Sequence, residues 1–326
     1  MPPGCAKNNS MNDAVPVLDY AAVMKAVTPA RAIERVRDGF IRHAKGEWTM
    51  PSKVYLDSAP HGDFRAMPAA GDGLAMLKWV TSFPGNSARN LPTVTGTILV
   101  SDARTGRWLA LVDGRSVTAL RTGAAAAVAS QALESDTAQR AGLVGCGLHG
   151  RWAGACLKTA GYDEGVCADV NPSAAQAAAD ELGWSVGSVS EAMACDVVTL
   201  VTPGYEPVMR ASHLRPGMHV NALGADGPGK AEMTIEAVEQ CELYCDEWHQ
   251  ASHGGELTGA VGSGRIIRDR VTELGAVLTG HSPGRGSQEV VTLFDSTGLA
   301  IQDLAIVKVV LDEYHAGSIE ATTISL

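Results

Sequence analysis

The sequence has few aromatic residues, few charged residues and no long apolar run. Phe, Trp and Tyr make up 5% of the 326 residues and charged residues 19%, whereas hydrophobic residues reach 45%. This balance excludes a disordered chain and a fibre. No segment approaches the ~18 consecutive apolar residues of a membrane span, and the first residues lack the basic-then-apolar pattern of a secretory signal. We therefore expect a globular, cytoplasmic protein.

Positive charge is also scarce, since the sequence has 26 Lys and Arg residues but 36 Asp and Glu residues, which gives a formal net charge of −10. Nucleic acid and acidic membranes would meet net repulsion, so we expect neither as a partner. The seven cysteines, without an export signal, are expected to be reduced thiols. Whether Met1 or Met11 is the true start stays open.

The length exceeds the size at which one hydrophobic core stops growing, which predicts two domains. Short strands follow a helix that begins at Thr28-Pro29 and fill residues 52–113, with a hairpin turn at 102–106. After an Ala-rich helix at 116–135, strands and helices alternate, which is typical of a doubly wound parallel sheet. We predict an α/β fold with a Rossmann domain at 124–297 and a discontinuous α+β domain at 1–123 with 298–326, closed by an apolar terminal helix.

A glycine-rich hexad lies where a dinucleotide-binding loop belongs, directly after the predicted strand 141–144 and before a helix. Its first glycine allows a tight turn, its second lets the backbone approach a pyrophosphate, and its third permits close helix–strand contact. Asp169 follows 22 residues after Gly147, where a carboxylate accepts hydrogen bonds from ribose hydroxyls and repels a 2′-phosphate. This predicts NAD as cofactor, with NADP less favoured; a plain turn and a solvent-facing aspartate are the alternative. The hexad is Gly145, Cys146, Gly147, Leu148, His149 and Gly150.

Several segments have a characteristic order and spacing along the chain, namely residues 50–57, 63–69, 77–86, 91–106, 110–129, 142–150, 215–233 and 291–305. Together they resemble the ornithine cyclodeaminase/μ-crystallin family, in particular its archaeal-type alanine dehydrogenase-like subgroup. This resemblance implies a homodimer whose N-terminal domain and terminal helix form the dimer interface and half of the substrate pocket, and whose Rossmann domain binds NAD. It also implies hydride transfer at an amino acid Cα through an imine. True cyclodeaminases carry an arginine near Lys53, and this departure argues against ornithine cyclisation.

The resemblance assigns roles to three charged residues of this chain. Arg121 would clamp the substrate carboxylate, because a planar guanidinium binds a carboxylate bidentately; a surface pair with Asp113 is the alternative. Lys78, in an apolar strand, would be the catalytic lysine and contact the substrate, unless it points to water from an edge strand. Asp226, just after a predicted strand, would be the catalytic general base and contact the substrate; a simple turn aspartate is the alternative.

Weaker candidates complete the predicted site. Lys53 would bind substrate, but its sequence context fits a solvent-facing lysine equally well. Among the hydroxyl residues, Thr297 would lie near the substrate. Three others match positions that approach the cofactor: Thr93, Thr122 and Ser296.

One competing pattern would form a metal site. Four potential zinc ligands follow one another at a spacing of four, which would align them on one continuous helix. Residues 241–246 have the pattern of a strand and 252–255 that of a loop, so we predict no metal. The four residues are Cys241, Cys245, His249 and His253.

We therefore expect an NAD-dependent oxidoreductase that acts on a small α-amino or imino acid, either alanine dehydrogenase-like or ketimine reductase-like. One alternative is an ornithine cyclodeaminase, which uses NAD without net redox change and releases ammonia. Another is a non-catalytic, crystallin-like protein that binds NAD(P) or a small ligand. The presence of Lys78, Arg121 and Asp226 together argues against a pure binding protein, which has no need of a base.

Overall fold

The computed structural model describes residues 14–204, 206–227 and 229–325, so the two alternative start sites lie outside the described residues. The first half of the chain contains β1 (Ala14–Leu18), α1 (Tyr20–Ala26), α2 (Pro29–Ala44), β2 (Val54–Ser58), β3 (Gly62–Gly71), β4 (Leu74–Ser82), β5 (Val94–Asp102), β6 (Trp108–Asp113), α3 (Gly114–Leu133), β7 (Arg140–Val144), α4 (Leu148–Ala160) and β8 (Glu164–Ala168). The second half contains α5 (Pro172–Leu182), β9 (Ser185–Val186), α6 (Val189–Ala192), β10 (Val197–Leu200), β11 (His219–Ala222), α7 (Ile235–Val238), β12 (Glu242–Cys245), α8 (Trp248–Gly254), α9 (Thr258–Gly262), β13 (Val271–Glu273), α10 (Leu274–Leu278), β14 (Thr292–Asp295), α11 (Ala300–His315) and β15 (Thr322–Ser325).

The strands form two sheets, which confirms the predicted α/β class. A seven-stranded mixed sheet has the order β15-β1-β6-β5-β4-β3-β2. An eight-stranded sheet has the order β13-β12-β14-β11-β10-β7-β8-β9, and its strands are paired in parallel throughout. This is the doubly wound arrangement that places ligands beside the carboxyl ends of the strands.

Local signals in the sequence account for several element boundaries. The Thr28 hydroxyl accepts a hydrogen bond from the amide of Arg31 and Pro29 occupies the first turn, so α2 begins where the sequence predicts. The Asp102 carboxylate accepts hydrogen bonds from two turn amides and thereby closes the hairpin between β5 and β6.

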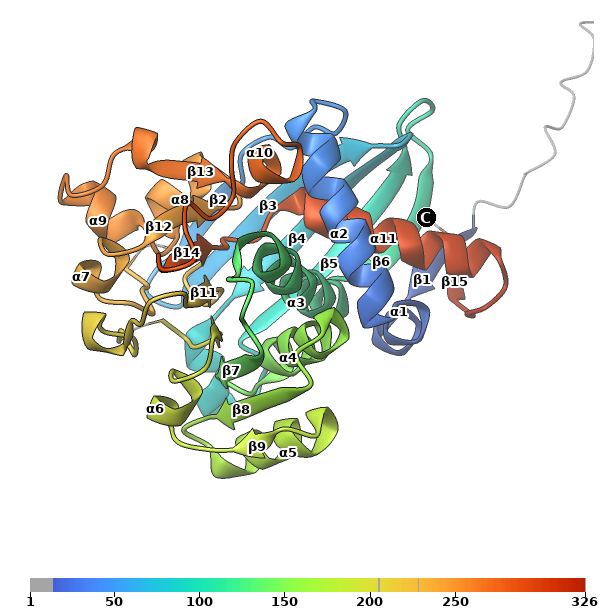
Figure 1. The fold of residues 1–326 in the computed structure, drawn as a ribbon. Helices are drawn as coiled ribbons and strands as arrows, with labels where there is room; N and C mark the ends of the chain where they lie inside the picture. The colour runs from blue at the N-terminus through green and yellow to red at the C-terminus, as the bar shows by residue number, and fades with distance from the viewer. Residues whose placement is uncertain (1–13, 205, 228, 326) are drawn as a thin grey trace, which may run out of the picture.

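Helix α3 is the central element of the fold. Fifteen of its 20 residues are buried, because it packs on β5 of the mixed sheet, on α4 and on β11 of the parallel sheet. Figure 1 shows α2, α3 and α11 lying across one face of the mixed sheet, with β7, β8 and α5 on the other side of α3. Because α3 passes through residues 123 and 124 without a break, the proposed domain division falls inside this helix.

The two faces of the mixed sheet differ in chemistry. On β4, Met76, Lys78 and Val80 face the helices and are buried, while Leu77 and Trp79 point to the other face and are each 41% exposed. The register pairs Lys78 with Met67 of β3 and with Ile98 of β5, so the lysine lies within an apolar row. Within the part of the chain that the structure describes, we find no helix whose length and apolar character suit a transmembrane passage.

Candidate active site

A cavity of about 490 Å³ lies where the mixed sheet, α3 and the carboxyl ends of the parallel strands meet. It brings together charged residues from the first half of the chain, the glycine-rich loop and the segment after β14. The predicted site residues along its wall are Lys53, Lys78, Thr93, Arg121, Thr122, Gly147, Leu148, His149, Gly150, Asp226, Ser296 and Thr297.

Lys78 is held inside the protein by a carboxylate and a hydroxyl. Its Nζ donates to Asp303 Oδ1 at 2.8 Å and to Thr118 Oγ1 at 2.6 Å. The side chain is 1% exposed and that of Asp303 0%. Burial lowers the pKa of Lys78 to about 8, although Asp303 opposes this effect. Lys78 is therefore neither an edge-strand lysine pointing to water nor a permanently charged one.

Arg121 lies beside the same carboxylate. Its guanidinium donates to Gln302 Oε1 at 3.3 Å, and its Nε lies 3.7 Å from Asp303 Oδ1. Gly298 has a φ of +78°, and a Cβ there would lie 2.4 Å from the guanidinium, so the backbone of this turn packs directly against Arg121. The alternative partner, Asp113, instead accepts hydrogen bonds from Ser116 and caps α3.

Asp226 lies elsewhere on the cavity wall, between two cations. Arg65 donates to Asp226 Oδ2 at 2.8 Å and Lys230 donates to its Oδ1 at 2.6 Å. Its side chain is 38% exposed. Burial in the cleft opposes ionisation, but the two cations outweigh it and hold the pKa of Asp226 below its ordinary value. In this arrangement Asp226 is a firmly ionised carboxylate and a weak base.

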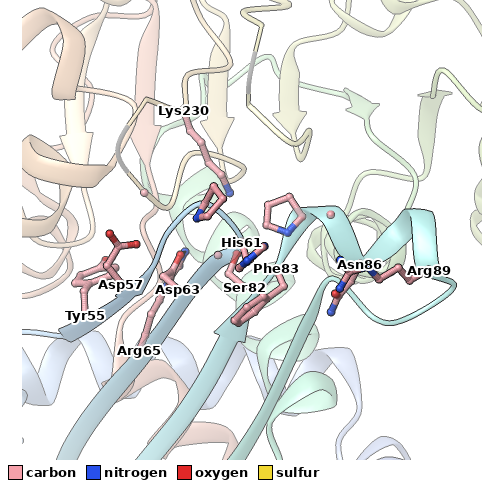
Figure 2. Close-up of a pocket in the computed structure, with 15 residues that line it drawn as sticks. Tyr55, Asp57, His61, Asp63, Arg65, Ser82, Phe83, Asn86, Arg89 and Lys230 are labelled. Atoms are coloured by element: carbon pink, nitrogen blue, oxygen red, sulfur yellow. The ribbon is translucent and has the colours of Figure 1, made fainter.

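Arg65 and Lys230 also line a second, outer cavity of about 740 Å³. Figure 2 shows Lys230 reaching toward this cavity from one side, with Arg65 and Asp63 on the strands opposite. Arg65 binds Asp63 at 2.6 Å and Asp226 at 2.8 Å, so a chain of ion pairs separates the outer cavity from the inner one.

Lys53 points inward rather than to solvent. Its Nζ donates to the carbonyl of Thr297 at 2.9 Å. Burial lowers its pKa to about 8, against the opposing influence of Asp246 and Asp226. The Thr297 hydroxyl in turn donates to Asp246 at 3.1 Å. Lys53 and the turn after β14 therefore hold each other in place.

The glycine-rich loop has the geometry of a turn made for close approach. Gly145 has a φ of +99°, and a Cβ on Gly150 would lie 1.9 Å from the carbonyl oxygen of Gly145. A Cβ on Gly147 would meet nothing within 4 Å, because this residue opens onto the cavity. Cys146 donates its amide to Asp169 Oδ2 at 2.6 Å, which ties the loop to the end of β8.

Several groups on the cavity wall have unused hydrogen-bonding capacity. The hydroxyls of Thr122 and Ser296 are buried and have no partner in the described part of the chain. Burial, together with Arg121 and Lys78, lowers the pKa of His149 to about 4, so this ring is neutral at physiological pH. Such groups are able to form hydrogen bonds to a polar ligand.

Sequence reasoning missed three residues that shape the site: Arg65, Lys230 and Asp303. The alternation of side chains between the two faces of β3 could have identified Arg65, because it places this residue on the same buried face as Met67 and Ala69. Asp303 lies in a helix that reads as plainly apolar, and nothing local indicates its contact with β4. Lys230 lies four residues after Asp226, but a turn-rich segment does not reveal that they pair.

The prediction that residues 252–255 form a loop was wrong. Helix α8 extends to Gly254, and the Glu247 carboxylate caps its start by accepting hydrogen bonds from the amides of His249 and Gln250. His249 and His253 stack on this helix with ring centroids 4.7 Å apart, whereas Cys241 Sγ donates to a carbonyl of α7. Among the residues that the structure describes, no group of three or more potential ligands is placed to hold a metal ion.

Comparisons with known proteins show which family the chain resembles over nearly its full length. The sequence profile of the ornithine cyclodeaminase/mu-crystallin family matches residues 15–318. An alanine dehydrogenase from Archaeoglobus fulgidus is 39% identical over 304 residues, which cover 91% of this chain and 94% of the relative.

Two solved structures share the fold over nearly the full length. One is an archaeal alanine dehydrogenase dimer with bound NAD, with a TM-score of 0.90, 37% identity and coverage of 95% of this chain and 99% of that one. The other is a Thermococcus litoralis Δ1-pyrroline-2-carboxylate reductase in complex with NADH and L-proline. It has a TM-score of 0.90, 26% identity and coverage of 95% and 100%.

The lowered pKa of Lys78 predicts a pH-dependent contribution to stability. Its pKa is about 8 in the folded protein and 10.5 is its ordinary value, so the unfolded chain binds more protons between these two values. The free energy of unfolding therefore gains a contribution that rises from pH 8 to pH 10.5. Lys78→Met removes this contribution, so the difference in unfolding free energy, wild type minus variant, should grow across this window in urea titrations. A difference that stays constant with pH would contradict the prediction.

Proposed function

Because this chain belongs to the ornithine cyclodeaminase/mu-crystallin family, we propose that it is an NAD-dependent oxidoreductase that interconverts a small α-amino acid and its imino acid. One observation carries this proposal. Two cations that suit a carboxylate, Lys78 and Arg121, share a cavity with a carboxylate, Asp226, and with the open glycine of a dinucleotide-binding loop, Gly147. A cavity that only bound a nucleotide would not need Lys78, Arg121 and Asp226.

The proposed reaction balances as a two-electron oxidation. A hydride leaves the amino acid Cα and a proton leaves the amino nitrogen, which gives the imino acid. NAD, when bound, supplies the acceptor for the hydride. Addition of water to the imine then releases ammonium and the oxo acid; in the reverse direction the same site reduces an imine.

The residues present fit NAD. Gly147 leaves open space in front of the loop, and the thirteen-residue helix α4 directs its N-terminus toward the same space, where backbone amides suit a pyrophosphate. The partnerless hydroxyls of Thr122 and Ser296 offer hydrogen bonds to a polar ligand. With the neutral His149, these residues, Leu148 and Gly150 would line the nucleotide, and Thr93 would approach it from the mixed sheet. Gly145 and Cys146 lie behind this lining and would shape the loop.

Arg121 and Lys78 would hold the substrate carboxylate. Both are cationic, both lie on one wall of the cavity, and charge-assisted hydrogen bonds are about twice as strong as neutral ones. Lys78 has a second capability, because a pKa of about 8 lets it hold or release a proton near neutral pH. Lys53 and the Thr297 backbone would support the substrate from the adjoining wall.

Asp226 would accept the proton from the substrate ammonium or from the attacking water, provided that its ion pairs with Arg65 and Lys230 weaken first. Its ion pairs with Arg65 and Lys230 lower its pKa and so weaken it as a base. A substrate that drew these cations away would raise the basicity of Asp226 as it bound. Proton transfer would then be coupled to occupation of the site.

The outer face of the mixed sheet supports a homodimer. Val54, Leu56, Leu77 and Trp79 are exposed there by 41–64%, and Phe64 stacks on Trp79 with ring centroids 5.5 Å apart. The strand register places these side chains on the face away from the helices. An apolar patch of this kind is typical of an interface, and the archaeal alanine dehydrogenase is described as a dimer.

The decisive experiment is incubation of the protein with NAD and a panel of amino acids, with NADH absorbance and ammonia followed in parallel. NADH formed together with ammonia supports the proposed oxidation. Imino acids supplied with NADH test the reverse direction. Ammonia without NADH would establish a cyclodeaminase instead, and no reaction in either direction would reject catalysis of this kind.

We predict that the protein binds NAD more tightly than NADP. Asp169 lies at the end of β8 beside the glycine-rich loop, where its charge would repel a 2′-phosphate. Asp169→Ser should narrow or reverse the preference in fluorescence titrations. Gly147→Val should abolish binding of both cofactors without unfolding the protein, because the new side chain enters open space in an extended backbone conformation. Equal affinity of the wild type for both cofactors would contradict this use of Asp169.

Substitutions should separate binding from proton transfer. Arg121→Ala should raise KM for the amino acid more than tenfold, since a hydrogen bond to a charged group is worth about 1.5–3 kcal/mol. Asp226→Asn should leave NAD binding intact and lower kcat by about 10²–10⁴-fold if the base acts in the rate-limiting step. Asp163→Asn, an exposed carboxylate after α4, is the matched control. Near-normal turnover in Asp226→Asn would refute the proposed base.

Trp79→Glu should shift the dimer toward monomers, because it places a charge in the centre of the exposed apolar face. Light scattering at several protein concentrations measures the mass directly. Val186→Glu, an exposed apolar residue on β9 at the edge of the parallel sheet, should leave the mass unchanged. A Trp79→Glu protein with the wild-type mass would place the interface elsewhere.

A further inference from the structure

Asp303 is a fully buried carboxylate behind the wall of the inner cavity. It lies in the first turn of α11, and its side chain is 0% exposed. Helix α11 follows β14 of the parallel sheet and packs on β3 of the mixed sheet, so its first turn meets both halves of the site. Burial of a carboxylate is unfavourable unless charged or polar partners compensate it.

The partners of Asp303 are the two cations that would hold the substrate. Lys78 Nζ donates to Oδ1 at 2.8 Å, and Arg121 Nε lies 3.7 Å from the same oxygen. The two cations come from different elements, β4 and α3, and would repel each other without a negative charge between them. One carboxylate therefore joins a strand of the mixed sheet to the central helix at the cavity wall.

The contacts of this cluster are incomplete in the free protein. Asp303 Oδ2 and Arg121 Nε are both buried and both lack a hydrogen-bond partner within the described residues. Their side chains are adjacent, but the 3.7 Å from Nε to Oδ1 is too long for a hydrogen bond. Arg121 thus has unused donor capacity beside Asp303 while the rest of its guanidinium lines the cavity.

We propose that Asp303 is a positioning residue that fixes Lys78 and Arg121 side by side as the carboxylate-binding pair of the cavity. It acts through these two residues and does not itself touch the ligand. This inference rests on the proposed function in one respect, namely that the cavity binds the carboxylate of a small acid.

The charges around Lys78 give the proposal a pH dependence. Arg121 of α3, Arg65 of β3 and the ring of His149 face Lys78 from the neighbouring elements, and Asp303 is its direct ionic partner. Burial and the nearby guanidinium groups disfavour the ammonium form, whereas Asp303 favours it. Removal of the negative charge should therefore lower the pKa of Lys78 further, so that the ammonium form is lost at a lower pH.

The test uses propionate, a carboxylate without an amino group to oxidise, titrated calorimetrically into the full-length protein with NAD at pH 6.5 to 9.5. Asp303→Asn keeps the size of the side chain and removes its charge. We expect the propionate Kd of this variant to rise about tenfold or more at pH 8, and to recover toward the wild-type value at pH 6.5. NAD affinity, measured by fluorescence, should change less than about twofold.

A double-mutant cycle distinguishes positioning from a general structural role. If Asp303 acts through Lys78 and Arg121, then Asp303→Asn should change propionate binding less in a Lys78→Met background than in the wild type, because only its effect on Arg121 remains. Asp72→Asn is the matched control, since Asp72 pairs with Lys308 of the same helix at 3.6 Å but outside the cavity, and it should bind propionate as the wild type does.

Three results would overturn the proposal: wild-type propionate affinity in Asp303→Asn, a loss that is equal at every pH and matched by loss of NAD binding, or no propionate binding by the wild type. These outcomes differ from a failure of the proposed function. A protein that binds propionate in an Asp303-dependent way and oxidises no amino acid would retain the positioning role and lose the reaction.

Discussion

A lysine in a nearly water-free position is the constraint on which this structure depends. Lys78 is 1% exposed in a row of apolar side chains, and a lone ammonium there would be strongly disfavoured. Asp303 makes the arrangement stable, and breaking a buried pair of this kind typically costs about 3–5 kcal/mol. Because the two residues are 225 positions apart, the chain must bring its last helix back to the first sheet before the cavity can form.

The segment from Asp295 to Asp303 makes this connection and contacts three of the cationic residues of the site. It leaves the parallel sheet at the end of β14, directs the Ser296 hydroxyl toward the cavity, and binds Lys53 through the Thr297 carbonyl. Gly298 then packs against Arg121, and α11 follows with Gln302 and Asp303. A single short stretch thus helps to position Lys53, Lys78 and Arg121, which lie far apart in the sequence.

The sequence predicted the elements well because their signals are local. The Thr28-Pro29 start of α2, the hairpin turn at Asp102 and the strand–glycine–helix pattern at Gly145 depend on neighbouring residues alone. The ion pairs of Arg65, Lys230 and Asp303 depend on which strands lie adjacent and on how far the final helix returns. No local pattern encodes that information. In α8 the local prediction of a loop at 252–255 was also wrong, because the histidines and glycines of this segment do not show that Glu247 caps a helix.

The two walls of the cavity differ in how firmly their charges are fixed. On one wall, Lys78 and Arg121 surround a carboxylate with no exposed area, so their positions are set before a ligand arrives. On the other, Asp226 is 38% exposed and binds two cations that also border the outer cavity. The Arg65 side chain is 7% exposed, so only Asp226 and Lys230 of this cluster reach the solvent. The wall with Lys78 and Arg121 is therefore suited to orient a carboxylate, whereas the wall with Asp226 is able to respond to the charges of the ligand. This division suits a reaction in which one end of the substrate must stay still while the other loses a proton.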